Sequence, residues 1–361
     1  MTENQRVQII AEAGVNHNGS LEKALQLIDI AKESGADAVK FQTFKAEALT
    51  SHLAPKADYQ KRNTANTENQ LKMLQRLELD EGAHRKLIDH CKAQNIQFLS
   101  SPFDEGSLEL LVNRFDLPRI KISSGEITNL PFLLKIATTG KPVILSTGMS
   151  TLGEIESALG ALAFGYMGLA DKPALDVFQE AFNASEGQSI LQKKVILLHC
   201  TTEYPAAFEE VNLNAMKTLQ SAFGLPVGLS DHTPGIAVSI AAVARGASVI
   251  EKHFTISRDL PGPDHRASLE PAELKSMVQA IRQVEVAMGS PRKSPTPSES
   301  KNRIVARKSL VAACDILQGT AFSMENVTIK RPGSGVSPGR YWEIMGKKAL
   351  RDYKQDELIE I

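Results

Sequence analysis

The chain has 361 residues, a formal net charge of −1, and 42% hydrophobic against 23% charged residues. These proportions are those of a soluble globular protein, and the near-neutral charge provides no basic field for nucleic acid. No apolar run approaches the ~20 residues of a membrane-spanning helix, and the polar segment 1–6 lacks the pattern of a signal peptide. The scattered Cys91, Cys200 and Cys314 are typical of free thiols in a reducing compartment, so we expect a cytoplasmic protein.

Short apolar runs typical of buried strands alternate with segments of helical period along most of the chain. The runs occupy residues 7–13, 37–42, 96–100, 119–122, 143–146, 194–199, 226–229 and 249–254. In the clearest helical segment, Leu21, Ala24 and Ile28 share one apolar face between a Ser20 cap and a Gly35 stop. Eight such units in roughly 290 residues predict a (β/α)8 (TIM) barrel. An open doubly wound sheet is the alternative, because period alone does not show closure.

The rest of the chain predicts a linker and a small second domain. We assign the barrel to residues 1–289, with two long connections, 45–69 and 164–192, predicted as loops. Residues 290–304 are rich in Pro and Ser and predict a semi-rigid linker. Residues 305–361 contain short β-like runs between turn clusters. A domain this short has a marginal core, so we expect it to dock on another surface.

Two histidines follow the last two predicted strands. His232 ends the polar cluster after run 226–229, His253 lies at the end of run 249–254, and residues 236–244 between them are long enough for a helix. A strand–helix–strand crossover brings both imidazoles to the same edge of a parallel sheet. Neutral imidazoles there suit a divalent metal with open coordination positions. The alternative is two unrelated loop histidines.

Lysine and serine side chains lie at the carboxyl ends of five of the predicted strands. They belong to Lys40, Lys121, Ser101, Ser146 and Ser230. Such donors suit a phosphate or a carboxylate ligand. Two alternatives stay open: each lysine pairs with a neighbouring carboxylate such as Glu12 or Glu126, or one lysine forms a Schiff base.

The remaining cysteine and histidine positions carry simpler predictions. His199 and Cys200 are adjacent on a strand and point to opposite faces, so they cannot form a thiolate–imidazole pair. We expect Cys200 to be a small core residue. His52, His84 and His90 lie on polar stretches, and we expect them in solvent.

Seven motifs in chain order resemble the sialic acid synthase family. They are AEAGVNHNG at 11–19, VKFQ at 39–42, KISSGE at 121–126, LSTGM at 145–149, LSDHT at 229–233, EKHF at 251–254 and PGPD at 261–264. The tail, with KRPGSG at 330–335, resembles the antifreeze-protein-like (SAF) domain of the same family. The resemblance covers essentially the whole chain. It implies a metal-dependent enzyme that condenses phosphoenolpyruvate with an N-acylated mannosamine-type aldose and releases phosphate.

The resemblance also implies roles for individual residues. It implies that Mn²⁺, or alternatively Mg²⁺ or Co²⁺, is bound by His232 and His253. The implied phosphoenolpyruvate ligands are Lys40, Ser101, Lys121, Ser146 and Ser230, with Thr202 as a weaker candidate. The implied sugar ligands are Gln42, Glu126, Tyr204 and Asp264, with Arg331 reaching the sugar from the partner chain of a domain-swapped homodimer. Glu12 is the implied acidic group near the reacting water or the metal. Ser101 and Thr202 depart from some members, which have Thr and Asn at these positions.

Three questions stay open at the sequence level. One concerns the acceptor: segments 201–206 and 66–71 resemble the legionaminic acid branch, which favours 2,4-diacetamido-2,4,6-trideoxymannose over N-acetylmannosamine. Another is condensation with an aldose phosphate, as in octulosonate-phosphate or heptulosonate-phosphate synthases, although the sequence offers no second phosphate clamp. The last, of a different class, is a non-catalytic carbohydrate-binding barrel in which the tail is the functional part.

Overall fold

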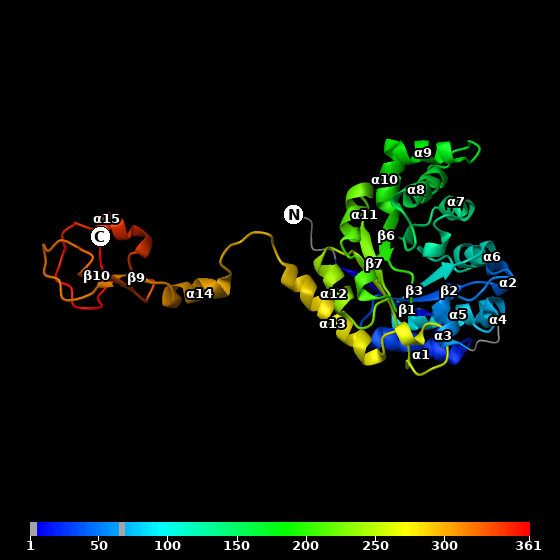
Figure 1. Cartoon of the computed structure of the whole chain (residues 1–361), viewed down its shortest axis with the longest axis horizontal. Coiled ribbons are helices and arrows are strands. Elements are labelled where there is room, and N and C mark those ends of the chain that lie inside the picture. The colour runs from blue at the N-terminus through cyan, green and yellow to red at the C-terminus, as the bar shows by residue number, and fades with distance from the viewer. Residues whose placement is uncertain (1–5, 65–68) are drawn as a thin grey trace. The chain divides into compact units, whose positions relative to one another are not determined.

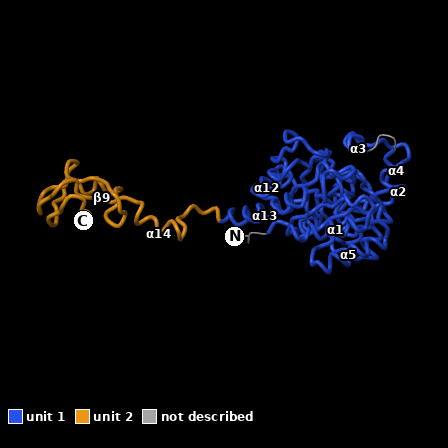
Figure 2. Tube along the Cα trace, turned by 90° about the horizontal axis from the view of Figure 1, so that it is seen from below, with its two compact units in different colours: residues 1–289 blue, residues 290–361 orange. Residues whose placement is uncertain are grey.

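A computed structural model describes residues 6–64 and 69–361 of the chain. They divide into two compact units, residues 1–289 and 290–361, which are coloured separately in Figure 2. Each unit has its own buried apolar core. No helix in the described ranges is both long and apolar enough to cross a bilayer.

The first unit is built on eight parallel strands (Figure 1). They are β1 (Gln8–Gly14), β2 (Ala38–Thr43), β3 (Gln97–Pro102), β4 (Ile120–Ile122), β5 (Val143–Ser146), β6 (Val195–Cys200), β7 (Val227–Asp231) and β8 (Val249–His253). The strand order is β3-β2-β1-β8-β7-β6-β5-β4, and β3 and β4 contact each other, so the sheet curls into a nearly closed barrel. The predicted barrel is confirmed, and the open sheet is excluded.

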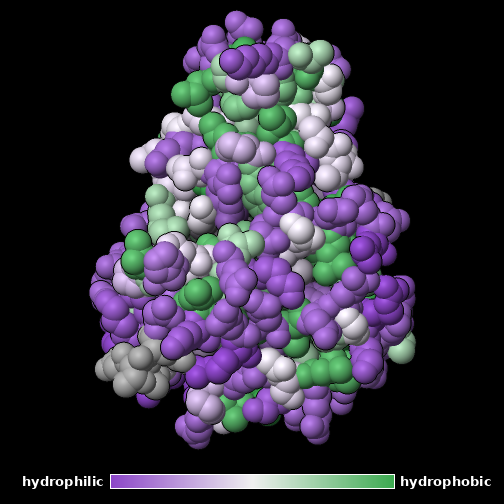
Figure 3. All heavy atoms as spheres, turned by 90° about the vertical axis from the view of Figure 1, so that its right-hand side faces the viewer, coloured by the Kyte–Doolittle hydropathy of each residue, from purple (hydrophilic) through white to green (hydrophobic). Residues whose placement is uncertain are grey.

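Helices pack around the outside of the barrel. They include α1 (Leu21–Glu33), α5 (Glu81–Gln94), α6 (Glu105–Glu109), α7 (Leu130–Thr138), α8 (Leu152–Met167), α11 (Ala215–Phe223), α12 (Ala237–Ala244) and α13 (Pro271–Met288). The first helix begins as its sequence predicts, because the Ser20 side chain accepts a hydrogen bond from Lys23 N. The main core lies between these helices and the outer faces of the strands. In Figure 3 polar side chains cover most of the face in view, and apolar ones form scattered patches.

Alternation along each strand divides the barrel interior into layers. The lower layer is apolar and is formed by Ile10, Ala38, Leu99, Ile144, Leu198 and Val249. Two residues further along the strands, the inward positions change to polar groups. These are Glu12, Lys40, Ser101, Lys121, Ser146, Ser230 and Glu251, all of them buried. The apolar layer therefore forms a floor, and the polar layer opens toward the carboxyl ends of the strands, where barrel enzymes place their chemistry.

The prediction that residues 164–192 form a loop is wrong. They continue α8 and then form α9 (Leu175–Asn183) and most of α10 (Ser185–Lys194). The helices pack closely: a Cβ on Gly160 would lie 2.6 Å from Phe178 O, and the rings of Phe164 and Phe178 are 5.3 Å apart. Apolar residues surround most of α8, so its sequence lacks the one-sided period that marks a surface helix.

The other long connection lies between β2 and α5 and also contains short helices. These are α2 (Ala46–Leu49), α3 (Asp58–Asn63) and α4 (Gln70–Gln75). Residues 66–68 lie outside the described residues. They belong to the 66–71 segment that resembles the legionaminic acid branch.

The second unit begins with the segment predicted as a linker. That segment, residues 290–304, contains most of α14 (Pro297–Ala306), which Thr296 and Glu299 cap reciprocally, so about half of it is helical. Beyond it, β9 (Ser309–Ala312) and β10 (Val327–Lys330) pair antiparallel, and α15 (Tyr341–Ile344) follows. A small core centred on Leu310, Phe322 and Tyr353 holds this unit together.

Candidate active site

A cavity of about 370 Å³ opens at the carboxyl ends of the strands. Twelve of the fourteen residues singled out in the sequence line it: Glu12, Lys40, Gln42, Ser101, Lys121, Ser146, Thr202, Tyr204, Ser230, His232, His253 and Asp264. Glu126 is not among the lining residues; it is buried, and its carboxylate accepts a hydrogen bond from Asn129 Nδ2 at 2.7 Å. Arg331 belongs to the second unit and is exposed, and its Nε donates to Ala306 O at 3.1 Å. Strands far apart in the sequence thus converge on one cavity.

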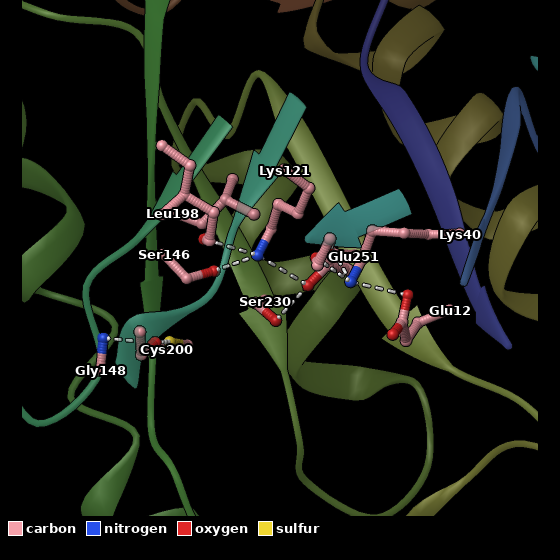
Figure 4. A network of polar contacts seen from close by, with 12 residues as sticks. Glu12, Lys40, Lys121, Ser146, Gly148, Leu198, Cys200, Ser230 and Glu251 are labelled. Atoms are coloured by element: carbon pink, nitrogen blue, oxygen red, sulfur yellow. Dashed lines mark hydrogen bonds and ion pairs between the residues drawn. The ribbon is translucent and has the colours of Figure 1, made fainter. Parts of the chain in front are cut away.

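Two lysines and two carboxylates form the floor of this cavity (Figure 4). Lys40 Nζ lies 2.8 Å from Glu12 Oε2 and 3.6 Å from Glu251 Oε2, and Lys121 Nζ lies 3.5 Å from Glu251 Oε1. All four side chains are at most 5% exposed. The lysine–carboxylate pairing considered from sequence is therefore present, with Glu251 as the shared partner. The pairing does not remove the lysines from the cavity, because both still line it.

The two carboxylates differ in their affinity for a proton. Burial raises the pKa of Glu12 to about 7, even though Lys40 opposes the shift. Burial acts on Glu251 in the same direction, but Lys121 and Lys40 together outweigh it and lower the pKa of Glu251 to about 2. Near neutral pH, Glu251 is a fixed negative charge, whereas Glu12 is close to its midpoint and can accept or donate a proton.

Hydroxyl groups complete the floor. Ser146 Oγ accepts a hydrogen bond from Lys121 Nζ at 2.7 Å, and Ser101 Oγ lies 3.4 Å from Lys40 Nζ. Ser230 Oγ donates to Glu251 Oε1 at 2.9 Å. Lysine and serine donors held this way are suited to an anion carrying phosphate and carboxylate groups.

The two histidines lie side by side at the cavity wall, with ring centroids 5.5 Å apart. His232 Nδ1 is 2.6 Å from Thr201 O. A carbonyl only accepts, so Nδ1 carries the proton and the lone pair of a neutral ring is on Nε2. His253 Nδ1 is buried and has no hydrogen-bond partner among the described residues. Burial lowers the pKa of His232 to about 4 and that of His253 well below its ordinary value.

These properties test whether the pair could hold a metal. Neutral imidazoles with a free nitrogen lone pair are the usual form of histidine ligands. The described residues contain no group of three or more His, Cys, Asp and Glu side chains arranged around a common point. His232 Nε2 lies 3.3 Å from Ser230 Oγ, so an ion would replace that contact. The two imidazoles fit an ion held by two protein ligands, with its other positions left to substrate and water.

A second buried ion pair lies on the outer faces of the strands that carry the histidines. Lys252 Nζ is 2.9 Å from Asp231 Oδ2, and both side chains are fully buried. Asp231 also accepts hydrogen bonds from Thr233 and Ser239. Each member of the pair is adjacent in sequence to one of the two histidines. The pair thus joins the ends of β7 and β8 and fixes the backbone positions of both imidazoles.

Helix α3 covers part of the cavity and contacts two other loops. Tyr59 on α3 stacks near Tyr204, at 4.9 Å between ring centroids, and Tyr204 lies 4.2 Å from the His232 ring. Arg62 pairs with Glu203 at 2.7 Å, which joins α3 to the loop after β6. Asn63 Nδ2 donates to Pro263 O at 2.7 Å, which joins it to the loop after β8.

Sequence reasoning missed three polar groups of the cavity. Glu251, Ser124 and Cys200 all line it, and Ser124 Oγ contacts Cys200 Sγ at 3.1 Å and accepts from Gly148 N at 3.0 Å. Cys200 is buried as predicted, but it faces the cavity rather than the core. The period of two along a strand was the available signal, because Glu251 lies two residues before His253.

The prediction that His84 lies in solvent is wrong. It is fully buried, and its Nε2 lies 2.9 Å from Thr43 Oγ1. His90 is half-buried and pairs with Asp29 at 2.7 Å, whereas His52 is exposed as expected.

Comparison with known proteins identifies the family. Residues 27–293 match the model of the NeuB family, and residues 307–360 match that of the SAF domain. The chain belongs to the NeuB family. It is 54% identical to an N,N'-diacetyllegionaminic acid synthase of Campylobacter jejuni, over 98% of this chain and 99% of that protein.

Further relatives agree with this membership. An N,N'-diacetyllegionaminic acid synthase of Legionella pneumophila is 44% identical, over 94% of this chain and 89% of that protein. Among solved structures, the N-acetylneuraminic acid synthetase of Leptospira borgpetersenii superposes with a TM-score of 0.66 at 33% identity, over 83% of this chain and 90% of that chain.

Proposed function

We propose that this protein condenses phosphoenolpyruvate with 2,4-diacetamido-2,4,6-trideoxymannose and water, giving N,N'-diacetyllegionaminic acid and inorganic phosphate. The observation that carries the proposal is the cavity, which combines a floor of lysines and serines with two neutral imidazoles at its wall. The relative at 54% identity over almost both full lengths supports the choice of sugar. N-acetylmannosamine is the competing acceptor.

The cavity floor is the proposed site of phosphoenolpyruvate. Lys40 and Lys121 offset the charge of its phosphate and carboxylate, and Ser101 and Ser146 donate hydrogen bonds. Ser230 joins them when its hydroxyl proton turns from Glu251 to the substrate. Because Glu251 already holds both lysines at 3.5–3.6 Å, their ammonium groups are positioned before the substrate arrives. Such preorganisation lowers the cost of binding and keeps C3 of the enol ether aligned with the acceptor.

Gln42, Tyr204 and Asp264 line the cavity and are the proposed sugar ligands there. Burial raises the pKa of Asp264 to about 6. C3 of phosphoenolpyruvate forms the new bond to the aldehyde carbon of the open-chain sugar. The C2 cation that results takes up water, and the tetrahedral adduct loses phosphate by cleavage of its C–O bond.

Glu12 is the proposed acceptor of the proton lost by that water. Its carboxylate lies in the cavity within 2.8 Å of Lys40, and a pKa of about 7 suits proton transfer near neutral pH. His232 and His253 are the proposed ligands of Mn²⁺, with Mg²⁺ or Co²⁺ as possible replacements. A bound ion would polarise the aldehyde carbonyl as a Lewis acid.

An incubation with phosphoenolpyruvate, Mn²⁺ and each sugar tests the function. We expect phosphate release and a product of the mass of the nine-carbon acid, both abolished in Lys121→Met. The matched control is Lys141→Met, because Lys141 pairs with Asp116 at the surface. No phosphate release with either sugar, with or without EDTA, would refute the proposal.

We also propose a cytoplasmic, domain-swapped homodimer in which Arg331 of one chain completes the sugar site of the other. Co-expression of Arg331→Ala chains with Lys121→Met chains tests the swap. Each mixed dimer then contains one intact site, so about a quarter of the wild-type activity should return. If Arg331 acts within its own chain, the mixture stays as inactive as its parents.

A further inference from the structure

One wall of the cavity is apolar, whereas its floor is charged. The wall is formed by Val15, Leu49, Met73, Leu74, Leu77 and Phe103. These residues belong, with Phe44, to a hydrophobic cluster separate from the main core of the barrel. Leu49 and Leu74 are only half-buried, so part of their apolar surface faces the cavity rather than the cluster.

Most of this wall comes from the connection between β2 and α5. Leu49 ends α2, and Met73 and Leu74 lie on α4, while the lysines and histidines lie at the ends of the strands. Because the connection follows the carboxyl end of β2, its helices lie beyond the strand-end layer that holds the charged floor. The wall is therefore within the same cavity as the floor and available to the far end of a substrate that reacts there.

Three polar side chains of the same connection are linked to one another by hydrogen bonds. Thr50 Oγ1 donates to Gln70 Oε1 at 3.3 Å, and Gln70 Nε2 donates to Gln60 Oε1 at 3.4 Å. Gln60 Oε1 also accepts from Ala57 N at 3.0 Å. A sugar hydroxyl arriving at the wall meets mainly apolar carbon, and the amides beside it are engaged with one another, so much of its desolvation goes uncompensated.

We propose that this apolar wall selects the acceptor by receiving the C6 methyl and the 4-acetamido methyl of the sugar. The inference rests on the proposed function and deepens it by assigning specificity to Leu49 and Leu74. N-acetylmannosamine carries hydroxyls at both of these carbons, so its far end loses water without gaining partners. The exclusion of a hydroxylated analogue by an apolar pocket is modest, about ten- to a hundredfold in kcat/KM.

The test measures kcat/KM for both sugars at saturating phosphoenolpyruvate. Wild type should prefer the trideoxy sugar within that range. Leu74→Gln and Leu49→Gln should each lower the preference about tenfold, since an amide can pair with a hydroxyl. Leu74→Met, which keeps an apolar side chain, should retain it. The matched control is Leu25→Gln, because Leu25 is a half-buried helix residue packed on the main core away from the cavity.

The outcomes separate the two claims. If wild type turns over neither sugar, the proposed function fails and the wall fails with it. If wild type turns over both sugars equally, or if folded Gln variants keep the wild-type preference, the wall proposal alone is overturned. Thermal unfolding of each variant identifies those that are folded. If both Gln variants are unfolded, the ratio of kcat/KM for the two sugars in wild type still tests the wall proposal.

Discussion

Replacement of Glu251 by Gln tests the charge balance of the cavity floor. Glu251 lies 3.5 Å from Lys121 and 3.6 Å from Lys40, and all three side chains are almost fully buried. At an effective dielectric constant of 20, one such pair has a Coulomb energy of about 5 kcal/mol. Removing one partner of a buried pair costs about 3–5 kcal/mol, and here the cost falls on Lys121, because Lys40 keeps Glu12 as a partner.

For a domain of this size, such a loss lowers Tm by about 10 °C. The same change should strengthen the binding of phosphoenolpyruvate, since the ligand then replaces a missing negative charge. We expect its Kd to fall about tenfold, equivalent to about 1.4 kcal/mol. Thermal unfolding of the barrel, followed by far-UV circular dichroism at pH 8 with increasing phosphoenolpyruvate, measures both effects, because a bound ligand raises Tm by mass action.

Glu126→Gln is the matched control, since Glu126 is also buried but is hydrogen-bonded by Asn129. It should change Tm much less than Glu251→Gln. Two results would refute the reasoning: a Tm of Glu251→Gln within about 2 °C of wild type, or weaker stabilisation by phosphoenolpyruvate than in wild type.

Three further predictions concern proton transfer, metal and tail. If Glu12 is the base, its ionised form is the active one. The value of kcat/KM for the sugar at saturating phosphoenolpyruvate should therefore fall as the pH drops below about 7. An unaltered pH profile in Glu12→Gln would exclude that role. Calorimetric titration should show that His253→Ala loses Mn²⁺ binding. The control His199→Ala should keep it, because His199 does not line the cavity and hydrogen-bonds to Val211 O. Equal binding by both variants would disprove the ligand assignment. Arg331→Ala should fold normally and lose about thirtyfold or more in kcat/KM for the sugar, as one charged contact is worth ~2–4 kcal/mol, whereas unchanged kinetics would remove the tail from the active site.

Strand ends were the part of the site that the sequence predicted best. A barrel fixes where inward-facing residues lie, so short motifs such as LSDHT and EKHF locate His232 and His253 without any knowledge of packing. The same period of two places Glu251 on the inward face beside His253, but the motif assigns it no role. The shared contact of Glu251 with two lysines depends on strands that the sequence separates by more than a hundred residues.

The errors have a common physical origin in helices whose surroundings are not solvent. His84 lies in a polar stretch, yet it shares a helix face with Leu87, Ile88 and Cys91 and is buried with them. Residues 164–192 were predicted as a loop. Their first part continues α8, which is apolar on most sides and so lacks a one-sided period. They are helical because small residues of α8 let α9 approach closely. In both cases the tertiary neighbours, which local sequence does not contain, decide the environment.

The connection between β2 and α5 has an implication for how relatives of this protein diversify. Residues that would carry out the chemistry come from all eight strands, so altering them disturbs the whole barrel. The apolar wall, in contrast, comes largely from one contiguous stretch of chain that contains α2 and α4. A single exchanged segment could thus give the same catalytic floor a new acceptor, which makes this stretch the natural unit for grafting between family members.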